Sequence, residues 1–171
     1  MDIFDAIKTR RSVRTFNDTP VPQELADKIA EAGTYAATGR NLQAPLIIEV
    51  RNKTLRDRLS KMNADVMGVD SDPFYGAPLI FVVLADKSVS THVYDGSLVL
   101  GNMMLAAHAL GLGSCWIHRA KEEFESDEGK EILRSLGITG EYEGIGHLAV
   151  GYFDGDLPPA KPRKNNYIIK T

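Results

Sequence analysis

The feature that most constrains the fold of this chain is a long apolar run at residues 93–117. Between residues 96 and 110 almost every side chain is apolar or small, so a helix formed here has no polar face. Such a helix lies in a large core, in a membrane or against another chain. The run carries polar residues and stops at Gly111, whereas a membrane span needs about 20 uninterrupted apolar residues. Because 171 residues provide little core to cover a helix on every side, we expect a second subunit to cover one side.

The bulk composition is that of an ordinary single-domain protein, and we expect one domain spanning residues 1–171. A net charge of −3 gives no general reason to expect nucleic acid or an anionic membrane as a partner. Cys115 is the only cysteine, which excludes an internal disulfide and is typical of a reducing compartment. Residues 1–11 contain no apolar segment of a secretory signal. The expected location is therefore the cytoplasm.

Capping residues and the helical spacing of apolar side chains predict the helices. We expect a short first helix capped by Asp2, a helix over residues 19–33 with Pro22 in its first turn, a short helix from Asn52 through Met62, the apolar helix within residues 96–110, and a helix that begins after Ser126 and ends at Gly137. Residues 63–77 are rich in aspartate, glycine and proline, so we expect them to form a loop.

Short apolar runs predict strands at residues 46–50, 78–85, 112–117 and 145–152. The run at 78–85 is continuous and β-branched, which favours a central position in a sheet. The tail, residues 154–171, is interrupted by three prolines, so we expect an extended arm that lies along another surface. The chain as a whole is expected to form about four helices and four or five strands around one core.

A compact basic segment follows the first helix. It contains Arg10, Arg11, Ser12 and Arg14, which together offer three permanent charges and a hydroxyl within five residues. Arginine presents a forked donor that suits phosphate, and serine adds a neutral hydrogen bond. In the other interpretation, Arg10 and Arg11 only complement the partial negative charge at the end of the helix. The spacing of these residues does not decide between the two.

The loop at residues 34–45 is small and polar. Asn41 and Gln43 can each donate and accept a hydrogen bond, which suits the edge of a heterocycle. Ordinary loop chemistry explains the same composition.

Several catalytic signatures are absent from the sequence. There is no phosphate-binding P-loop and no nucleophile elbow, and the glycines at 111 and 113 lack the third glycine of a dinucleotide fingerprint. The four histidines have no metal-ligand spacing with one another or with the cysteine. Cys115 lies inside an apolar strand, where a free cysteine usually behaves as a small hydrophobic residue. A chain so poor in reactive side chains points to a bound cofactor that carries the chemistry.

Taken together, the motifs resemble those of the FMN-dependent nitroreductase family along essentially the whole chain. The resemblance rests on four segments in the family's order and spacing: Arg10-Arg11-Ser12-Val13-Arg14-Thr15-Phe16, Thr38-Gly39-Arg40-Asn41-Leu42-Gln43-Ala44-Pro45, the segment 105–117 that ends in Gly-Leu-Gly-Ser-Cys-Trp-Ile, and Lys161-Pro162-Arg163-Lys164. The chain looks like a short member of the family.

The resemblance implies an α+β fold, in which a central, mostly antiparallel sheet of four or five strands is flanked by helices in a mixed α/β arrangement. It also implies an interlocked homodimer with a C-terminal arm. The apolar helix would then lie at the subunit interface, which explains why it lacks a polar face. Two FMN molecules would be bound at that interface.

The resemblance also implies a role for individual residues. Arg10, Ser12, Lys161 and Arg163 are expected at the phosphate of FMN, and Arg14 at the pyrimidine side of the ring or the ribityl chain. Residues 116–119 would line one face of the flavin, with a main-chain N–H near residue 118 directed at flavin N5, and the loop around residues 37–41 would reach the flavin from the second subunit. The complete expected cofactor-binding set is Arg10, Arg11, Ser12, Arg14, Ala37, Thr38, Gly39, Asn41, Gln43, Cys115, Trp116, Ile117, His118, Arg119, Lys161 and Arg163.

The function implied by the resemblance is that of an FMN-dependent NAD(P)H oxidoreductase. NADH or NADPH would pass hydride to flavin N5 and leave, and a nitroaromatic, quinone or other flat aromatic acceptor would then take its place. Two alternatives remain open. One is a specialised relative that performs reductive dehalogenation or flavin fragmentation, and the other is a flavin-binding or redox-sensing dimer with little turnover.

The chain departs from the family pattern at the substrate side of the expected site. Ala37 and Thr38 stand where the family often has Pro-Ser, and His118 and Arg119 stand where it often has a small or acidic residue. The chain also lacks the additional helices that cover the substrate channel in longer members. The sequence therefore leaves open the identity of the acceptor and the choice between NADH and NADPH.

Overall fold

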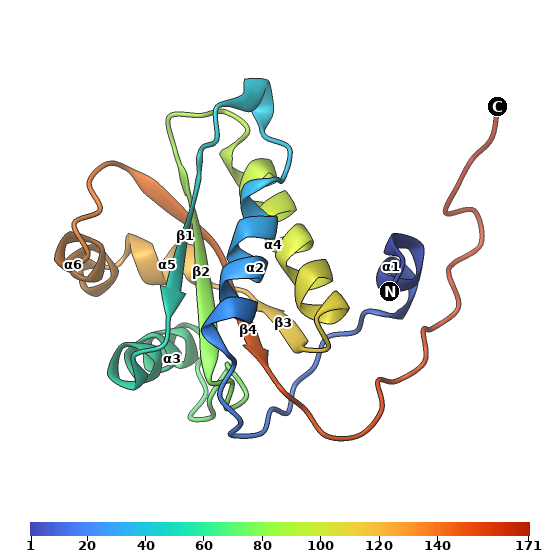
Figure 1. The fold of residues 1–171 in the computed structure, drawn as a ribbon. Helices are drawn as coiled ribbons and strands as arrows, with labels where there is room; N and C mark the ends of the chain where they lie inside the picture. The colour runs from blue at the N-terminus through green and yellow to red at the C-terminus, as the bar shows by residue number, and fades with distance from the viewer.

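The computed structural model describes all residues 1–171 and has a four-stranded antiparallel sheet at its centre, with strand order β1-β2-β4-β3. Helices cover both faces of this sheet (Figure 1). The elements along the chain are α1 (Ile3–Thr9), α2 (Gln23–Thr34), the 3-10 helix η1 (Gly39–Asn41), β1 (Pro45–Val50), α3 (Lys53–Met67), β2 (Leu79–Asp86), α4 (His92–Ala109), β3 (Gly113–Ile117), α5 (Ala120–Glu125), α6 (Asp127–Ser135) and β4 (Tyr142–Gly151). The predicted fold class is thus confirmed.

Strand β2 is apolar along almost its whole length because both of its faces are buried. Phe81 and Val83 belong to a core that β2 shares with α2 and α4, whereas Ile80 and Val82 belong to a second core shared with α3, α5 and α6. Successive side chains of a strand point to opposite faces, so each face of β2 supplies one core. This confirms the central position that the sequence predicts. β1 differs, because it is an edge strand in which only Val50 is fully buried.

The apolar helix α4 packs one side against the sheet and leaves the other open. Val99, Leu100 and Met103 are buried in the core, while Tyr94 is 72% exposed and Leu98 is 50% exposed. A contiguous exposed apolar patch often marks a surface that another molecule covers. The single chain therefore leaves one side of α4 uncovered, as the sequence predicts.

The start of β4 is shaped by glycines that let α5 approach it. The pairing of β2 with β4 skips Ile145 between Val83↔Gly146 and Leu84↔Gly144, which is a β-bulge. A Cβ on Gly144 would lie 2.1 Å from the carbonyl oxygen of Ala120, the first residue of α5. Only glycine fits at this position, and its fit brings α5 directly onto β4.

Several predicted element boundaries are wrong. α2 begins at Gln23 with Pro22 as its N-cap, because proline and the residue before it favour extended backbone. α3 continues to Met67 and ends at a left-handed Gly68, so the first third of the expected loop at 63–77 is helix. β4 begins at Tyr142 instead of residue 145. The structure has six α-helices, whereas the expected count was about four. Each of the five predicted positions is helical, and α5 is the helix that the sequence did not predict.

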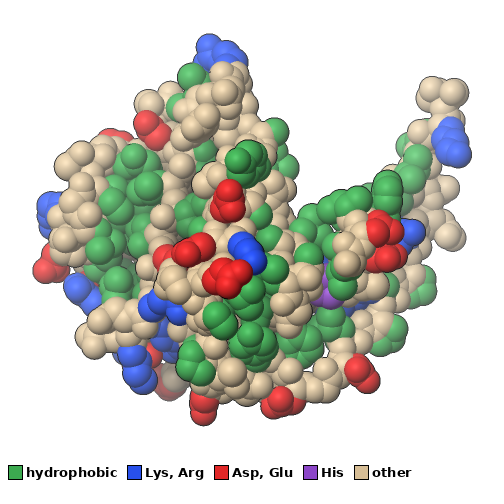
Figure 2. Space-filling model, in the orientation of Figure 1, with side chains coloured by type: hydrophobic (Ala, Val, Ile, Leu, Met, Phe, Trp, Pro, Cys, Tyr) green, Lys and Arg blue, Asp and Glu red, His purple; other side chains and the backbone are tan.

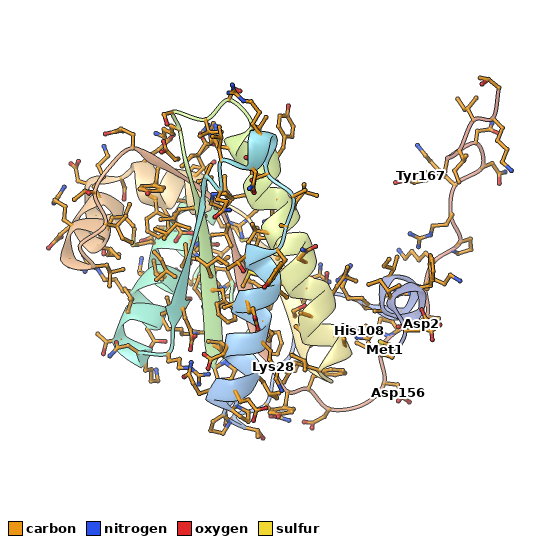
Figure 3. The ribbon with its side chains drawn as sticks, turned by 45° about the horizontal axis from the view of Figure 1, so that its top comes forward. Met1, Asp2, Lys28, His108, Asp156 and Tyr167 are labelled. Atoms are coloured by element: carbon orange, nitrogen blue, oxygen red, sulfur yellow. The ribbon has the colours of Figure 1, made fainter.

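The two termini extend away from the sheet. α1 lies beside the end of α4, and the C-terminal tail runs past it into solvent (Figure 1). In the space-filling view a hollow separates this part from the body, and hydrophobic side chains line the tail that rises from it (Figure 2). Tyr167 lies on this tail, far from the sheet (Figure 3), and is 70% exposed. No helix combines the length and the apolar composition that crossing a membrane requires.

Candidate anion-binding site

A pocket of about 390 Å³ joins the basic segment near the N-terminus to the proline-rich tail. None of the residues around it is hydrophobic: they are Arg10, Arg11, Ser12, Arg14, Pro158, Pro159, Lys161 and Arg163. The fold thus brings together the two basic segments that the sequence singled out from opposite ends of the chain. The pocket holds five cationic side chains and no carboxylate, which makes it a site for an anion.

Main-chain pairing with the sheet fixes the N-terminal side of the pocket. Ser12 forms a parallel bridge with Ser114, and the N–H of Val13 donates to the carbonyl of Ser114 at 3.0 Å. The basic segment therefore lies along the free edge of β3. At the preceding helix, Thr9 contacts Nε2 of His108 at 2.8 Å, which ties the end of α1 to α4. In Figure 3, His108 lies next to α1.

The arginines of the pocket have hydrogen-bonding capacity that the chain does not satisfy. A buried guanidinium nitrogen of Arg10 and the Nε of Arg11 have no partner. Burial and the neighbouring charge of Arg11 lower the pKa of Arg10 from its ordinary value, so the charged form is destabilised where it stands. A bound anion would reverse both effects. Arg11 also donates to the carbonyls of Lys8 and Arg10 at the end of α1. Part of its role is therefore to complement the negative end of this helix, as the other interpretation of the basic segment proposes.

The tail side of the pocket is exposed and held by local contacts. Arg163 donates to the carbonyl of Lys161 through two nitrogens, at 2.6 and 3.2 Å. Proline at 158 and 159 fixes the backbone φ angle where the tail turns over the basic segment. The tail therefore presents its cations on a constrained backbone, and its side chains keep free donors for a ligand.

Cys115 lies directly behind this pocket, on the core side of β3. It is 3% exposed and belongs to the core shared with α3, α5 and α6. Burial raises the pKa of the Cys115 thiol, although the charge of Arg14 and a hydrogen bond from Ser12 act in the opposite direction. The thiol is thus the stable form, whereas a nucleophilic cysteine needs the thiolate.

The segment after β3 makes a sharp turn. Ile117 is buried and ends the strand, Trp116 is partly buried on the opposite core, and His118 is exposed. Arg119 has a left-handed backbone with φ 77° and donates from Nε to Oδ1 of Asn63 at 2.9 Å. Its side chain therefore points back to α3. Asn63 was missed by sequence reasoning, because residues 63–77 were assigned to a loop.

The loop at residues 37–43 is strained and anchored to α4. Arg40, Asn41 and Gln43 all have φ between 51° and 55°, a region that non-glycine residues seldom adopt. The loop is held by Asp95, which is 3% exposed and accepts from the Gly39 N–H at 3.0 Å. Asp95 also accepts from the hydroxyl of Thr91 at 2.9 Å. Strain that its surroundings hold in place is typical of functional loops. In the sequence, Asp95 stands out only as a carboxylate within an apolar run.

The loop and the basic pocket are not brought together within one chain. Thr38 and Gln43 line a different pocket, of about 470 Å³, between α2 and β1. Ala37, Gly39 and Asn41 belong to the same loop, and Asn41 is exposed. In Figure 1 the loop lies at the top of the molecule, at the opposite end of α4 from α1 and the basic segment. A ligand held by both clusters needs two chains.

Comparisons with known proteins agree with this geometry. The nitroreductase family model matches residues 7–73 and 67–152. A proposed NADH dehydrogenase/NAD(P)H nitroreductase of Methanothermobacter thermautotrophicus is 35% identical over 68% of this chain, and the match spans 60% of that relative. An NAD(P)H-dependent FMN reductase of Bacillus subtilis is 28% identical over 95% of this chain and 70% of its own length.

A solved structure gives the same result for the fold. The crystal structure of a Bacteroides fragilis nitroreductase with bound FMN superposes with a TM-score of 0.88 at 27% identity, and covers 100% of this chain and 99% of its own. Family model, relatives and fold thus coincide over nearly the whole chain, and the chain belongs to the nitroreductase family.

Proposed function

We propose that this protein is an FMN-dependent NAD(P)H oxidoreductase that reduces nitroaromatics, quinones or similar flat acceptors. The observation that carries the proposal is the basic pocket, where Arg10 and Arg11 keep buried nitrogens without a partner. The terminal phosphate of FMN is an anion with several acceptor oxygens, and it fits that donor set. The names of the relatives, which include an FMN reductase and an NAD(P)H nitroreductase, support the same assignment.

In this proposal each part of the site has a separate task. Arg10, Ser12, Lys161 and Arg163 hold the phosphate, and Arg11 contributes charge beside them. The segment Trp116–Arg119 lies along one face of the ring. The loop 37–43, with Ala37, Thr38, Gly39, Asn41 and Gln43, approaches the same ring from the second subunit. Its separation from the basic pocket within one chain supports this arrangement.

The protein contributes positioning and electrostatics to the reaction. FMN, when bound, supplies a ring that accepts hydride from NADH or NADPH and delivers it to a flat acceptor that binds in the same place. Arg14, at the pyrimidine side, places a permanent positive charge where negative charge develops on reduction. The N–H of His118 is free to donate to the ring. No side chain needs to act as a nucleophile, because holding the two reactants in contact lowers the barrier.

The functional unit in this proposal is a homodimer with FMN at the subunit interface. The open side of α4, the exposed apolar residues of α1 and the apolar end of the tail support it. Phe4 is 66% exposed on α1, and Ile168 is 78% exposed on the tail. Exposed apolar groups on three separate elements are expected where a second subunit covers them. A cytoplasmic location is part of the proposal, supported by the single free thiol of Cys115.

A spectroscopic and kinetic experiment tests the proposed function. The purified protein is expected to be yellow, or to become so on reconstitution, and to release FMN instead of FAD on denaturation. NAD(P)H oxidation is expected to rise well above the oxidase background when menadione or a nitrofuran is added. Protein that cannot be reconstituted with FMN would refute the proposal. Flavin-loaded protein that reduces no acceptor would indicate a binding or sensing role instead.

Replacing Cys115 by alanine is expected to leave FMN binding and turnover nearly unchanged. The buried thiol is held in its neutral form, so it supplies neither charge nor a nucleophile to the pocket. The variant should lose about 1 kcal/mol of stability or somewhat more, since a small cavity opens in the core. Steady-state kinetics and thermal unfolding check both parts. A fall of more than about tenfold in rate with FMN still bound would restore Cys115 as a catalytic candidate.

A further inference from the structure

Behind the turn at His118 and Arg119 lies a buried hydrogen-bond network built from three elements. Asn63 of α3, Glu123 of α5 and His147 of β4 are each at most 1% exposed. Asn63 Nδ2 donates to the carbonyl of His118 at 2.8 Å and also to Oε1 of Glu123. His147 Nε2 lies within hydrogen-bond distance, 2.9 Å, of the same Oε1.

The chemistry of its neighbours fixes the orientation of the Asn63 amide. The carbonyl of His118 can only accept a hydrogen bond, and the guanidinium of Arg119 can only donate one. Nδ2 must therefore face His118 and Oδ1 must face Arg119, as the structure has it. Both ends of the amide are used on consecutive residues of the turn. No other uncharged side chain of this size can donate and accept in this way.

The turn that Asn63 holds is unfavourable by itself. Arg119 adopts φ 77° and ψ 4°, a left-handed conformation that costs energy for a residue with a Cβ. Glycine usually occupies such positions, and here an arginine does so with its side chain bonded to Asn63. A strained turn persists when the surrounding structure fixes it from several sides. Asn63 supplies two of those contacts.

The main-chain N–H groups of His118 and Arg119 have no partner in the chain. The main-chain N–H of His118 donates to no group of the chain, while the carbonyl of the same residue is bonded to Asn63. His118 is exposed, whereas the residues of the network behind it are buried. The aromatic rings of Phe74 and Phe124 flank His147, with centroids 5.0 and 6.2 Å from its own. The buried network thus holds the turn from one side, and the N–H of His118 stays available as a donor.

We propose that Asn63 is a positioning residue that fixes the turn at residues 118–119, so that the free N–H of His118 is aimed at the flavin. Glu123 and His147 hold the amide in turn. The inference rests on the proposed function and adds a residue to the site that does not touch the cofactor. It also gives Arg119 a task, which is to hold the turn instead of binding the acceptor.

Two substitutions at Asn63 test this inference in the FMN-loaded protein. Asn63→Ala removes all three hydrogen bonds of the amide, and Asn63→Asp keeps the size of the side chain but can donate at most one where Asn63 donates two. For both, we expect FMN affinity to stay within about threefold of wild type, because the phosphate pocket is untouched. The rate of flavin reduction at saturating NAD(P)H should fall at least about tenfold, and the visible absorption band of the bound flavin should change.

The matched control is Asn52→Ala, at the other end of α3. Asn52 caps that helix by accepting from the N–H of Leu55, so its loss destabilises α3 without touching the turn. This variant should reduce its flavin at the wild-type rate with an unchanged spectrum. If Asn63→Ala does not fold, Asn63→Asp decides the question with the same measurements.

The possible results separate this inference from the proposed function. Wild-type protein that binds no FMN overturns both. If wild type binds FMN and turns over, and a folded Asn63 variant keeps the wild-type reduction rate and spectrum, then the positioning role alone is overturned. An equal loss of rate in the Asn52 variant also overturns it, since the effect would then follow from the stability of α3.

Discussion

Replacing Arg10 and Arg163 together by alanine is expected to weaken FMN binding by about 3–6 kcal/mol, since each charge-assisted hydrogen bond contributes about 1.5–3 kcal/mol. That loss equals roughly two to four orders of magnitude in the dissociation constant. The fold should persist, because Arg163 is exposed and Arg10 leaves a buried nitrogen without a partner. Fluorescence titration with FMN gives the affinity, and circular dichroism of the apoprotein checks the fold.

The matched control removes two positive charges elsewhere. Lys130 and Arg134 are exposed on α6, away from the basic pocket, and replacing both by alanine changes the net charge by the same amount. This control should bind FMN with nearly wild-type affinity. If the control loses as much affinity as the Arg10 and Arg163 variant, then general charge is responsible and the pocket has no specific role.

Mixing two inactive variants is expected to restore activity if each site is built from two chains. One parent carries Arg10→Ala and Arg163→Ala, and the other carries Thr38→Trp and Asn41→Trp in the loop. Each heterodimer then contains one site with all four lesions and one wholly native site. With random pairing, about a quarter of all sites should regain FMN binding and turnover, because half the dimers are heterodimers with one good site each. Activity and bound flavin are measured after co-refolding.

A reciprocal mixture makes this experiment decisive. A chain carrying all four substitutions is co-refolded with wild type, and only the heterodimers are isolated by a tag on each chain. If the loop acts from the partner, both sites of this heterodimer are damaged and it should be nearly inactive. If the loop and the arginines serve the same site from one chain, this heterodimer keeps a native site while the first mixture recovers nothing. Activity in the wild-type heterodimer, together with no activity in the first mixture, would contradict the shared site.

The elements that the sequence predicted well are those whose character depends on local pattern. The run at 78–85 is apolar without interruption because both faces of β2 are buried. Ser126 and Gly137 bound α6 as expected, since the hydroxyl of Ser126 accepts from the N–H of Gly129 and Gly137 adopts φ 73°. Such capping residues act within a few positions of the chain.

The elements that the sequence missed depend on distant partners. α5 follows a left-handed Arg119 with no ordinary capping residue, and its place is set by Gly144, which lies on β4. The second half of α3 carries Asn63, a polar residue at a fully buried position, which gives no sign of burial before Glu123 is known to lie beside it. Tertiary packing decides both, and local propensity does not.

The candidate site divides in the same way. The chemistry of the basic segment could be predicted because the charges of Arg10, Arg11 and Arg14 stand side by side in the sequence. Only the family resemblance predicted that this segment shares a site with Lys161 and Arg163, because no local sequence pattern links the two ends of the chain. The anchoring of the loop by Asp95 could not be predicted, because a hydrogen bond from Gly39 joins residues that are far apart in sequence.

The origin of the basic pocket in two distant segments has a consequence for biosynthesis. Residues 10–14 leave the ribosome early, but residues 158–163 are made last among the lining residues. At about 5–20 residues per second, the second half of the pocket follows the first by roughly 8–30 s. During that interval the nascent chain has no complete binding site for a phosphate. A complete phosphate site therefore needs the chain to be made through residue 163, and a chain truncated before residue 161 lacks both tail cations of the pocket.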